Sequence, residues 1–415
     1  MIERVVITGM GTVSPLGLTV QETWRNIVNG ISGVGPISLF DASELAVKIA
    51  CEVKNFNPEN YISFKEVRRR DRYEQFATAA AQEAIRQAGL EVNEANAGRI
   101  GVFVSSAIGG IVSLMNGFES LRLEGPRRIS PFMIPMYLND GAAGMVAIDN
   151  GCKGPTFSIV SACASGGDAV GMAWTMIRAG VIDAAIAGAS DATLTAVCIA
   201  AFDRLGALSR RSSDYSMTPQ PFDRNRDGLV IGEGAAIMVL ERESQARARG
   251  AEILAELAGY AATEDAYHIT APSEDGAGGA QAMRLAMQTA AINHDEVDYI
   301  NAHGTATALN DLSETRAIKS AFGDLAYNIP VSSTKSMTGH MMGATGTLEA
   351  IICVNVVREH ILPPTIHYQT PDPLCDLDYI PNQAREKPVR VAVSNAFGFG
   401  GHNSVLVVRA YKKEF

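Results

Sequence analysis

Short runs of hydrophobic residues alternate along the chain with longer stretches in which apolar positions recur at helical spacing. The apolar runs end in glycine, serine or threonine and predict buried strands at residues 5–8, 101–105, 157–160 and 181–187. Helical spacing predicts helices over residues 73–88 and 165–179. Strands and helices that alternate in this way are typical of an α/β protein with parallel strand pairs.

Two parts of the sequence resemble each other. GEGAAIMVLER at residues 232–242 and GGHNSVLVVRA at residues 400–410 each combine a glycine-rich turn with an apolar strand. The strand, turn and helix around Cys163 also have a counterpart in IPVSSTKSMTGH and the small-residue helix that follows it. Two copies indicate a duplicated fold rather than a solenoid. We therefore expect related halves over residues 1–250 and 251–415, with a functional site at their seam.

The composition narrows the class of protein. Of the 415 residues, 47% are hydrophobic and 19% are charged, which favours a large ordered core. The net charge of −10 disfavours a nucleic-acid binder. The most apolar stretch, residues 181–202, is interrupted by Asp183 and Asp191, so no membrane span is expected. Six scattered cysteines without a CxxC pair predict neither zinc nor disulfides, and the expected location is the reducing cytoplasm.

Cys163 lies in a turn of small residues, SACASGG, between a predicted strand and a predicted helix. A thiol at this point is close to unpaired backbone N–H groups and to the positive end of the helix dipole. Such surroundings lower a thiol pKa from about 8.5 towards neutrality, as suits a nucleophile. Because most single cysteines are buried structural residues, the turn leaves both interpretations open.

Two histidines occupy matching positions later in the chain. NAHGTAT and KSMTGH place His303 and His340 in glycine-rich turns after predicted strands, where ligands gather in α/β proteins. A single loop histidine is usually a surface residue, but two in matching contexts together with Cys163 favour a catalytic group. A metal site is less favoured, because no carboxylate ligand lies nearby in the sequence.

A third glycine-rich loop, NAFGFGGHN, covers residues 395–403. Its glycines would let backbone N–H groups approach a substrate closely, as an oxyanion hole requires. The alternative is a tight turn before the last strand.

Taken together, these motifs resemble those of the β-ketoacyl-acyl-carrier-protein synthases, most like type II of fatty acid synthesis, within the thiolase-like superfamily. The resemblance runs from VVITGMGTVSPLG at residue 5 to GFGGHNSVLV at residue 407 and includes SACASG, NAHGTAT, SSTKSMTGH and NAFGFGGHN in order. It implies a thiolase-like α/β fold in which two duplicated βαβαβαββ halves form a layered α-β-α-β-α core.

The resemblance also implies a reaction. Cys163 would take an acyl group from carrier-protein phosphopantetheine, while backbone N–H groups of Cys163 and Phe399 hold the oxyanion. His303 and His340 would stabilise the enolate formed when malonyl-carrier-protein loses CO₂. The product would be a 3-oxoacyl chain two carbons longer. No cofactor is required, since the phosphopantetheine arrives on the carrier protein.

Further positions match residues with supporting roles in the family. Lys335 would support the histidine pair through Glu349, and Phe399 would sense whether Cys163 is acylated. Ile108 would limit access to the acyl pocket. The remaining substrate-binding positions are Thr305, Thr307, Phe397 and Gly398. A structural Na⁺ or K⁺ site would be formed by Asn301, Ala302, Glu349, Ser394 and Asn395.

A run of basic residues bears on which partners the protein could bind. It consists of Lys65, Arg68, Arg69, Arg70 and Arg72. From charge alone it is either a solvated helix face or a docking patch for an acidic protein. The resemblance assigns Lys65, Arg68 and Arg69 to docking of the acyl carrier protein. It also implies a homodimer with an isologous interface.

Three alternatives stay open. His402, ATALND at residues 306–311 and HMMGATG at residues 340–346 differ from common fatty-acid versions, and similar variants occur in ketosynthases of polyketide or unusual-lipid pathways. The second alternative, a non-catalytic partner similar to chain-length factors, would usually lack the nucleophile that Cys163 supplies. The third, a Cys-His hydrolase, would need a general base beside the thiol and open access for water.

Overall fold

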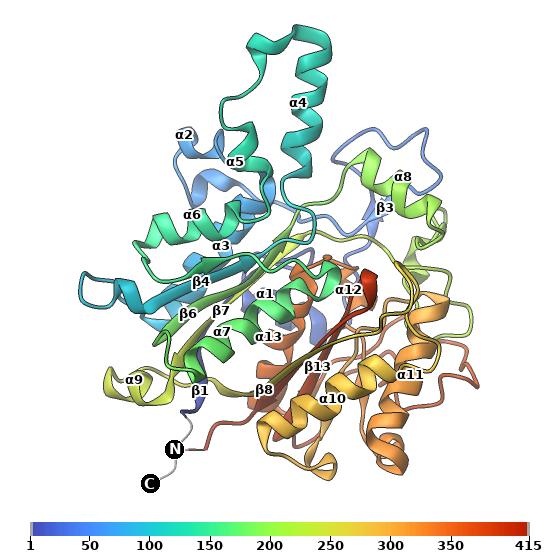
Figure 1. Ribbon diagram of the computed structural model, residues 1–415. Coiled ribbons are helices and arrows are strands. Elements are labelled where there is room, and N and C mark those ends of the chain that lie inside the picture. The colour runs from blue at the N-terminus through green and yellow to red at the C-terminus, as the bar shows by residue number, and fades with distance from the viewer. Residues whose placement is uncertain (1–2, 413–415) are drawn as a thin grey trace.

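The computed structural model describes residues 3–412, and a ten-stranded mixed sheet runs through its centre (Figure 1). From one edge to the other the strands are β10 (Val331–Ser332), β9 (Tyr299–Asn301), β13 (Val391–Phe397), β14 (His402–Arg409), β8 (Ala255–Glu264), β1 (Val5–Val13), β7 (Gly234–Arg242), β6 (Ala184–Asp191), β4 (Ile100–Ser105) and β5 (Thr156–Phe157).

The strands form two groups of the same topology. In β5-β4-β6-β7-β1 and in β10-β9-β13-β14-β8, two parallel pairings are followed by two antiparallel ones. Only two residue pairs, Val6 with Glu256 and Ile7 with Ala255, join β1 to β8. The repeated strand order agrees with a duplicated fold, whereas the boundary at residue 250 stays a prediction.

Helices complete five layers (Figure 1). One outer face is covered by α3 (Arg72–Ala88) and α6 (Gly141–Asn150), and the opposite outer face by α10 (Ala277–Ala290), which packs on α11 (Ala308–Phe322). Between the two strand groups, α7 (Ser165–Arg178) packs against α13 (Ala344–Glu359). The predicted α-β-α-β-α fold is confirmed.

Smaller elements surround these layers. The helices are α1 (Val20–Val28), α2 (Phe64–Val67), α4 (Ile111–Glu124), α5 (Met133–Tyr137), α8 (Ala196–Arg204), α9 (Glu243–Ala248) and α12 (Lys335–Thr338). Two short hairpins pair β2 (Gly35–Pro36) with β3 (Ile49–Ala50) and β11 (Ile361–Leu362) with β12 (Arg385–Glu386). Among the described residues, no helix has both the length and the apolar character needed to cross a membrane.

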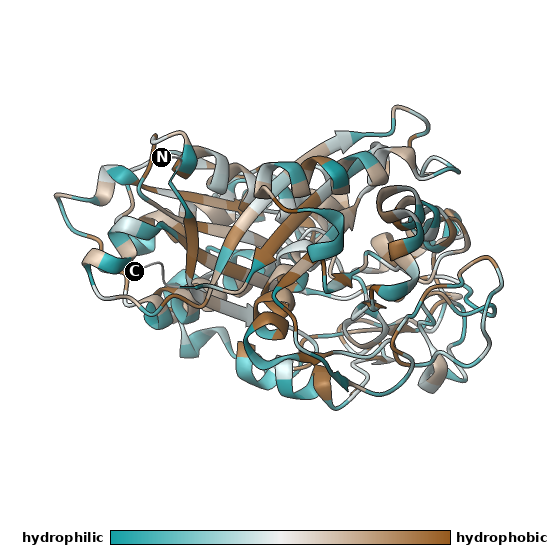
Figure 2. Ribbon diagram, turned by 90° about the horizontal axis from the view of Figure 1, so that it is seen from below, coloured by the Kyte–Doolittle hydropathy of each residue, from teal (hydrophilic) through white to brown (hydrophobic). Residues whose placement is uncertain are grey.

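The central helices owe their position to their side chains. Every residue of α13 from 344 to 357 is buried, as expected for a helix that is covered on all sides. In α7, glycines allow the close packing, because a Cβ on Gly171 would lie 2.2 Å from the ring of Tyr260 and one on Gly166 would lie 2.4 Å from the carbonyl oxygen of Gly343. Coloured by hydropathy, the strands in the middle of the molecule are brown and most teal segments lie at its periphery (Figure 2).

Most predicted elements lie close to their expected positions, but two strands differ. The strand expected at residues 157–160 is only the two-residue edge strand β5, after which the chain leaves the sheet towards the Cys163 turn. The strand expected at residues 181–187 begins at Ala184 instead. The reason is that the carbonyl groups of Gly180 and Val181 accept hydrogen bonds from the Arg99 guanidinium, at 3.0 and 2.7 Å, and form a turn.

Candidate active site

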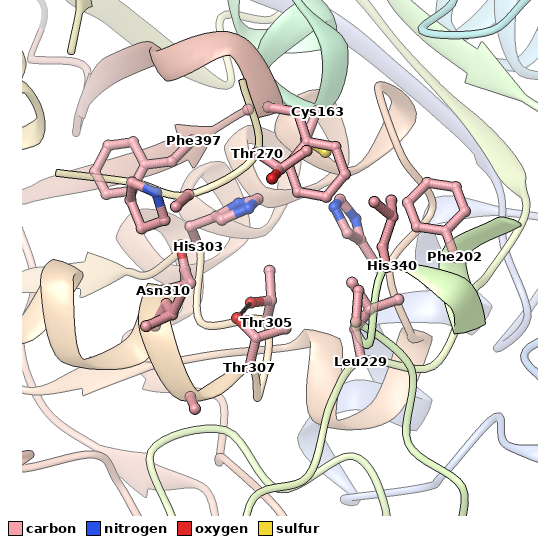
Figure 3. Close-up of a pocket in the computed structure, with 18 of the residues that line it drawn as sticks. Cys163, Phe202, Leu229, Thr270, His303, Thr305, Thr307, Asn310, His340 and Phe397 are labelled. Carbon is pink, nitrogen blue, oxygen red and sulfur yellow. Dashed lines mark hydrogen bonds between the residues drawn. The ribbon is translucent and has the colours of Figure 1, made fainter. Parts of the chain in front are cut away.

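Cys163, His303 and His340 line one cavity of about 230 Å³. Cys163 comes from the first half of the chain and the two histidines from the second, and their side chains point towards the same space (Figure 3). The cavity wall also includes Thr305, Thr307, Phe397, Gly398 and Phe399. The structure therefore brings most of the predicted catalytic and substrate-binding residues together at the seam between the halves.

The turn that carries Cys163 is held by hydrogen bonds on both sides. Ala162 adopts a left-handed conformation with φ of 52°, which few residues other than glycine adopt without cost. The Ser161 N–H donates to Ser165 Oγ at 2.9 Å, and Ser161 Oγ donates to Asp168 Oδ2 at 2.5 Å. Tyr260 from β8 donates to the other oxygen of Asp168 at 2.9 Å. These contacts fix the backbone that presents the thiol.

The pKa of Cys163 does not follow the sequence-based expectation. Burial raises the pKa of this thiol to about 11, although the charge of Lys335 and the backbone N–H of Phe399 act in the opposite direction. The expected lowering towards neutrality is wrong, because removing the thiolate from water outweighs the charge of Lys335 and the nearby backbone N–H groups. The resting sulfur is protonated and has to lose its proton as it attacks.

The glycine-rich loop at residues 395–403 packs directly on the Cys163 turn. A Cβ on Gly398 would lie 2.6 Å from the carbonyl oxygen of Ser161, so this approach requires glycine. The backbone N–H groups of Phe399 and Cys163 both favour negative charge at the sulfur. Two N–H groups aimed at one place are the donor pair that an oxyanion hole needs. The ring of Phe399 stacks on Phe202 with centroids 6.1 Å apart.

His303 lies just after β9 and is positioned by a carboxylate of α11. The backbone N–H groups of His303 and Gly304 donate to the two oxygens of Glu314 at 2.8 and 2.7 Å. Asn395 donates to the same carboxylate at 3.1 Å. Glu314 thus fixes the backbone of the histidine while it leaves the imidazole free to face the cavity.

His340 follows α12, and its ring lies edge-on to that of His303 with centroids 5.4 Å apart. Its Nδ1 is 3.2 Å from Thr345 Oγ1 at the start of α13. Within the described part of the chain, Nε2 of His340 and Nδ1 of His303 have no hydrogen-bond partner although they are buried. Unpaired polar atoms at such a depth are costly unless a ligand uses them, so they point to a substrate.

Both histidines are held uncharged. Burial lowers the pKa of His303 and of His340 well below the ordinary value of 6.5, and the charge of Lys335 lowers both further. At neutral pH each ring therefore has one N–H donor and one acceptor nitrogen. Over residues 3–412, no group of three or more His, Cys, Asp or Glu side chains is arranged to hold a metal ion.

Lys335 forms an ion pair with Glu349 behind the histidines. Lys335 Nζ lies 2.6 Å from Glu349 Oε1, and both side chains are 1% exposed. Burial raises the pKa of Glu349, whereas the charge of Lys335 and its hydrogen bond lower it. A buried charge of this kind is retained only when it is paired.

Among the residues expected to bind a cation, three buried oxygens have no hydrogen-bond partner in the part of the chain that the structure describes. These atoms are Asn301 Oδ1, Asn395 Oδ1 and Glu349 Oε2. Asn301 pairs with Ser394 in the parallel register of β9 and β13, and α13 contacts both strands. Ala302 is buried directly after β9. Oxygen ligands suit Na⁺ and K⁺, so this donor set fits the cation that the resemblance implies.

Ile108 stands apart from the other predicted substrate residues. It is not among the residues that line the described cavity, and its backbone N–H lies 3.3 Å from Asp191 Oδ1. By contrast, Thr305 and Thr307 are on the cavity wall with their hydroxyl oxygens 3.0 Å apart. The role of Ile108 in limiting the acyl pocket stays a prediction.

The basic run at residues 65–72 divides into an outer and an inner part. Lys65 and Arg68 are exposed, and Arg69 is half-buried against Glu66 and the Phe132 ring. The last two members instead bind inward: Arg70 makes two hydrogen bonds to Asp149 at 2.6 and 2.7 Å, and Arg72 pairs with Glu233 at 2.6 Å. Lys65 and Arg68 are therefore the members of the run most accessible to a partner.

Several residues that line the cavity or hold the catalytic side chains in place were not predicted from the sequence. Phe202, Leu205 and Thr270 line the cavity but belong to no motif. Glu314 belongs to no sequence motif and to no predicted element, and only the fold shows that it accepts from the His303 turn.

Comparison with known proteins identifies the family. The family profiles described as "Beta-ketoacyl synthase, N-terminal domain" and "Beta-ketoacyl synthase, C-terminal domain" match residues 2–246 and 254–369. The chain belongs to the β-ketoacyl synthase family. It is 48% identical over 410 residues to a 3-oxoacyl-[acyl-carrier-protein] synthase 2 of Staphylococcus aureus, with 99% of each chain covered.

Solved structures agree with this assignment. A β-ketoacyl synthase from Burkholderia phymatum is 34% identical with a TM-score of 0.92, and the match covers 99% of this chain and 100% of that one. A complex of a type II PKS acyl-carrier protein with its ketosynthase, bound to the hexaketide, contains a chain that is 38% identical with a TM-score of 0.89 and the same coverage.

Proposed function

We propose that the protein is a 3-oxoacyl-[acyl-carrier-protein] synthase that extends fatty acyl chains by decarboxylative Claisen condensation. The single observation that carries the proposal is the cavity in which the Cys163 thiol faces two neutral imidazoles, those of His303 and His340. A nucleophile that can hold an acyl group and two donors that can hold an enolate are the two requirements of this reaction.

The first half-reaction transfers the acyl group to the enzyme. The Cys163 sulfur forms a bond to the acyl carbonyl carbon, the bond to the pantetheine sulfur breaks, and that sulfur takes the proton which Cys163 loses. The backbone N–H groups of Cys163 and Phe399 stabilise the oxyanion of the tetrahedral intermediate.

The second half-reaction forms the carbon–carbon bond. The malonyl thioester loses CO₂, and His303 and His340 donate hydrogen bonds to the enolate oxygen that results. The carbanion attacks the acyl carbonyl, and the Cys163 sulfur leaves as a thiolate and takes up one proton from water. Burial keeps the imidazoles neutral, and the charge of Lys335 assists, so that each ring retains an acceptor and a donor nitrogen.

A ketosynthase of a polyketide or unusual-lipid pathway is the second candidate. The 38% identity to a chain of the type II PKS ketosynthase complex supports it. The departure from the family pattern at His402 does not discriminate between the two candidate functions. The His402 ring contacts Glu264 at 3.1 Å, and His402 is not among the residues that line the cavity. The 48% identity over nearly the full length to a 3-oxoacyl-[acyl-carrier-protein] synthase 2 favours the first candidate.

The acyl carrier protein is the proposed partner, and we place its docking at Lys65, Arg68 and Arg69. The exposure of Lys65 and Arg68 supports this, because an acidic carrier needs accessible cations. A solved relative in complex with its acyl-carrier protein supports the class of partner.

We also propose a homodimer formed over the β5 edge. Phe157 on this edge strand is 51% exposed, and Ile148 on α6, which contacts β5, is 72% exposed. An open strand edge with large exposed apolar side chains is a usual place for a second copy to bind. The Na⁺ or K⁺ held by Asn301, Ala302, Glu349, Ser394 and Asn395 and the cytoplasmic location likewise remain proposals.

Two variants of the nucleophile test the proposed reaction. Cys163→Ala should abolish acyl labelling and elongation, whereas Cys163→Gln should still release CO₂ from malonyl-carrier-protein because Gln fills the site without a nucleophile. The measurement follows acyl- and malonyl-carrier-proteins of graded chain length, with covalent label, CO₂ and condensed product as readouts. Cys152→Ala, at a buried cysteine outside the cavity, is the control and should stay active.

Elongation by the Cys163→Ala variant would refute the mechanism. The length profile of the unmodified protein decides between the pathways, because a fatty-acid enzyme should accept simple saturated acyl primers over a range of lengths.

A further inference from the structure

A buried carboxylate that the proposed chemistry does not use lies at the end of β6. Asp191 is 0% exposed, and it accepts hydrogen bonds from two separate segments of the chain. From the first half, Ser106 Oγ donates at 2.6 Å and the N–H of Ala107 at 3.1 Å to Oδ1. From the second half, the N–H of Gly343 donates to Oδ2 at 2.8 Å.

The contact with Gly343 leads directly to His340. Gly343 precedes the first residue of α13, a helix of 16 residues, so the carboxylate lies where the helix dipole favours negative charge. His340 is three residues earlier, and its Nδ1 is 3.2 Å from Thr345 in the first turn of the same helix. The backbone of His340 is held separately, because its N–H donates to the Val230 carbonyl and its carbonyl accepts from the Gly232 N–H, each at 2.8 Å. Fixing Gly343 therefore fixes the start of α13, and with it the Thr345 hydroxyl against which the His340 ring lies.

Gly343 also has little room to move. A Cβ at this position would lie 2.9 Å from Asp191 Oδ2, 3.2 Å from the nitrogen of Ala107 and 3.2 Å from the Cβ of Ser165. Ser165 begins α7 two residues after Cys163. Three segments thus meet around the Asp191 carboxylate: the one between His340 and α13, the one after β4, and the Cys163 turn.

We propose that Asp191 is a positioning residue for the condensation, whose carboxylate sets the place of His340 relative to the Cys163 turn by holding Gly343 against residues 106–108. It acts through backbone N–H groups and does not touch the substrate. The inference rests on the proposed function, because it takes from it the role of His340 in stabilising the enolate.

The first test measures decarboxylation alone. Asp191→Asn, made in the Cys163→Gln background, keeps the size of the side chain but replaces one acceptor oxygen by an NH₂ group that cannot accept from Gly343 or Ala107. With malonyl-pantetheine, which needs no carrier docking, CO₂ release should fall roughly 10- to 10²-fold, the cost of a displaced catalytic group.

A second variant approaches the same contact from the other side. Gly343→Ala keeps the charge of Asp191, and its φ of −59° accommodates alanine, but the new methyl group would press on the carboxylate. CO₂ release should fall here too. This variant keeps the proposal testable if Asp191→Asn does not fold.

Asp71→Asn is the matched control. Asp71 is also a buried aspartate that accepts backbone N–H groups at a helix N-terminus, from Tyr73 at 3.2 Å and Ser113 at 2.7 Å, but it lies outside the cavity. Its CO₂ release should stay within about twofold of the parent. Equal losses in Asp71→Asn and Asp191→Asn would overturn the proposal.

The pH profile of Cys163 alkylation supplies a second readout, which a general loss of packing would not shift in a defined direction. The charge of Asp191 contributes to the raised pKa of Cys163, after burial. Asp191→Asn in the protein with Cys163 intact should therefore shift the pH profile of iodoacetamide alkylation at Cys163 to lower pH, while decarboxylation falls. A shifted profile with unchanged decarboxylation would show that the charge of Asp191 acts on the thiol alone, and would overturn the positioning role.

Different outcomes would overturn the proposed function and the positioning role of Asp191. A Cys163→Gln parent that releases no CO₂ overturns the proposed function, and this inference with it. A parent that releases CO₂ and is unaffected by Asp191→Asn overturns the positioning role alone.

Discussion

The catalytic residues are governed by burial more than by their nearest charges. The Cys163 thiol, His303 and His340 all lie deep enough that the charged form of each is disfavoured. Lys335 adds to this for the imidazoles but opposes it for the thiol. One buried cation therefore favours neutral hydrogen-bond donors and eases formation of a thiolate in the same cavity.

This electrostatic arrangement predicts the pH dependence of decarboxylation. A histidine with a lowered pKa stays neutral until the pH falls below that pKa, so neither ring takes up a proton between about pH 8 and about pH 6. CO₂ release by the Cys163→Gln variant should be flat over this range. A rate that halves near pH 6.5, the ordinary value for histidine, would show that one ring titrates normally and would contradict the structure.

At the scale of elements, the seam depends on helices that approach each other unusually closely. The glycines of α7 leave room for Tyr260 and for the carbonyl of Gly343, and α13 is buried on every side. The Tyr260 hydroxyl reaches Asp168 only because Gly171 has no side chain, and Asp168 in turn holds Ser161 beside the nucleophile. Close packing and the conformation of the active-site turn are thus coupled.

Substitution of Gly171 tests this coupling. In Gly171→Ala the Cβ would lie 2.2 Å from the Tyr260 ring, so the variant should lose about 1–3 kcal/mol of unfolding free energy and acylate Cys163 more slowly. The matched control is Gly144→Ala in α6, where no heavy atom lies within 4 Å of the new Cβ, and which should gain about 0.5–1 kcal/mol. Urea unfolding measures both, and equal stabilities would contradict the packing argument.

The sequence was informative where a local pattern determines the structure. The helix over residues 73–88, the strand after which His303 occurs, and the fold class all follow from periodicity and motifs. The raised pKa of Cys163 could not be predicted from the sequence, because burial of the thiol depends on residues from both halves that only the fold brings together. Glu314, Asp191 and Thr270 were missed for the same reason: their partners are distant in sequence or belong to irregular segments.

At the scale of the whole molecule, the cavity is built by both halves, and the exposed cations of α2 lie on the first. A carrier protein that docks on the outer part of the basic run would be guided by charge, while the reaction itself takes place between neutral groups. Binding and chemistry are therefore expected to respond to different substitutions.

Charge reversal in the basic run tests carrier-protein binding separately from the chemistry. Lys65→Glu combined with Arg68→Glu should raise KM for acyl-carrier-protein about tenfold or more while leaving the rate with acyl-pantetheine unchanged, because only the former substrate presents an acidic protein surface. The effect should shrink as salt is added and screens the attraction. Arg390→Glu changes an exposed cation next to the start of β13, at the opposite end of that strand from Phe397, and is the control. Equal KM changes for both substrates would place these residues in folding or catalysis and not in docking.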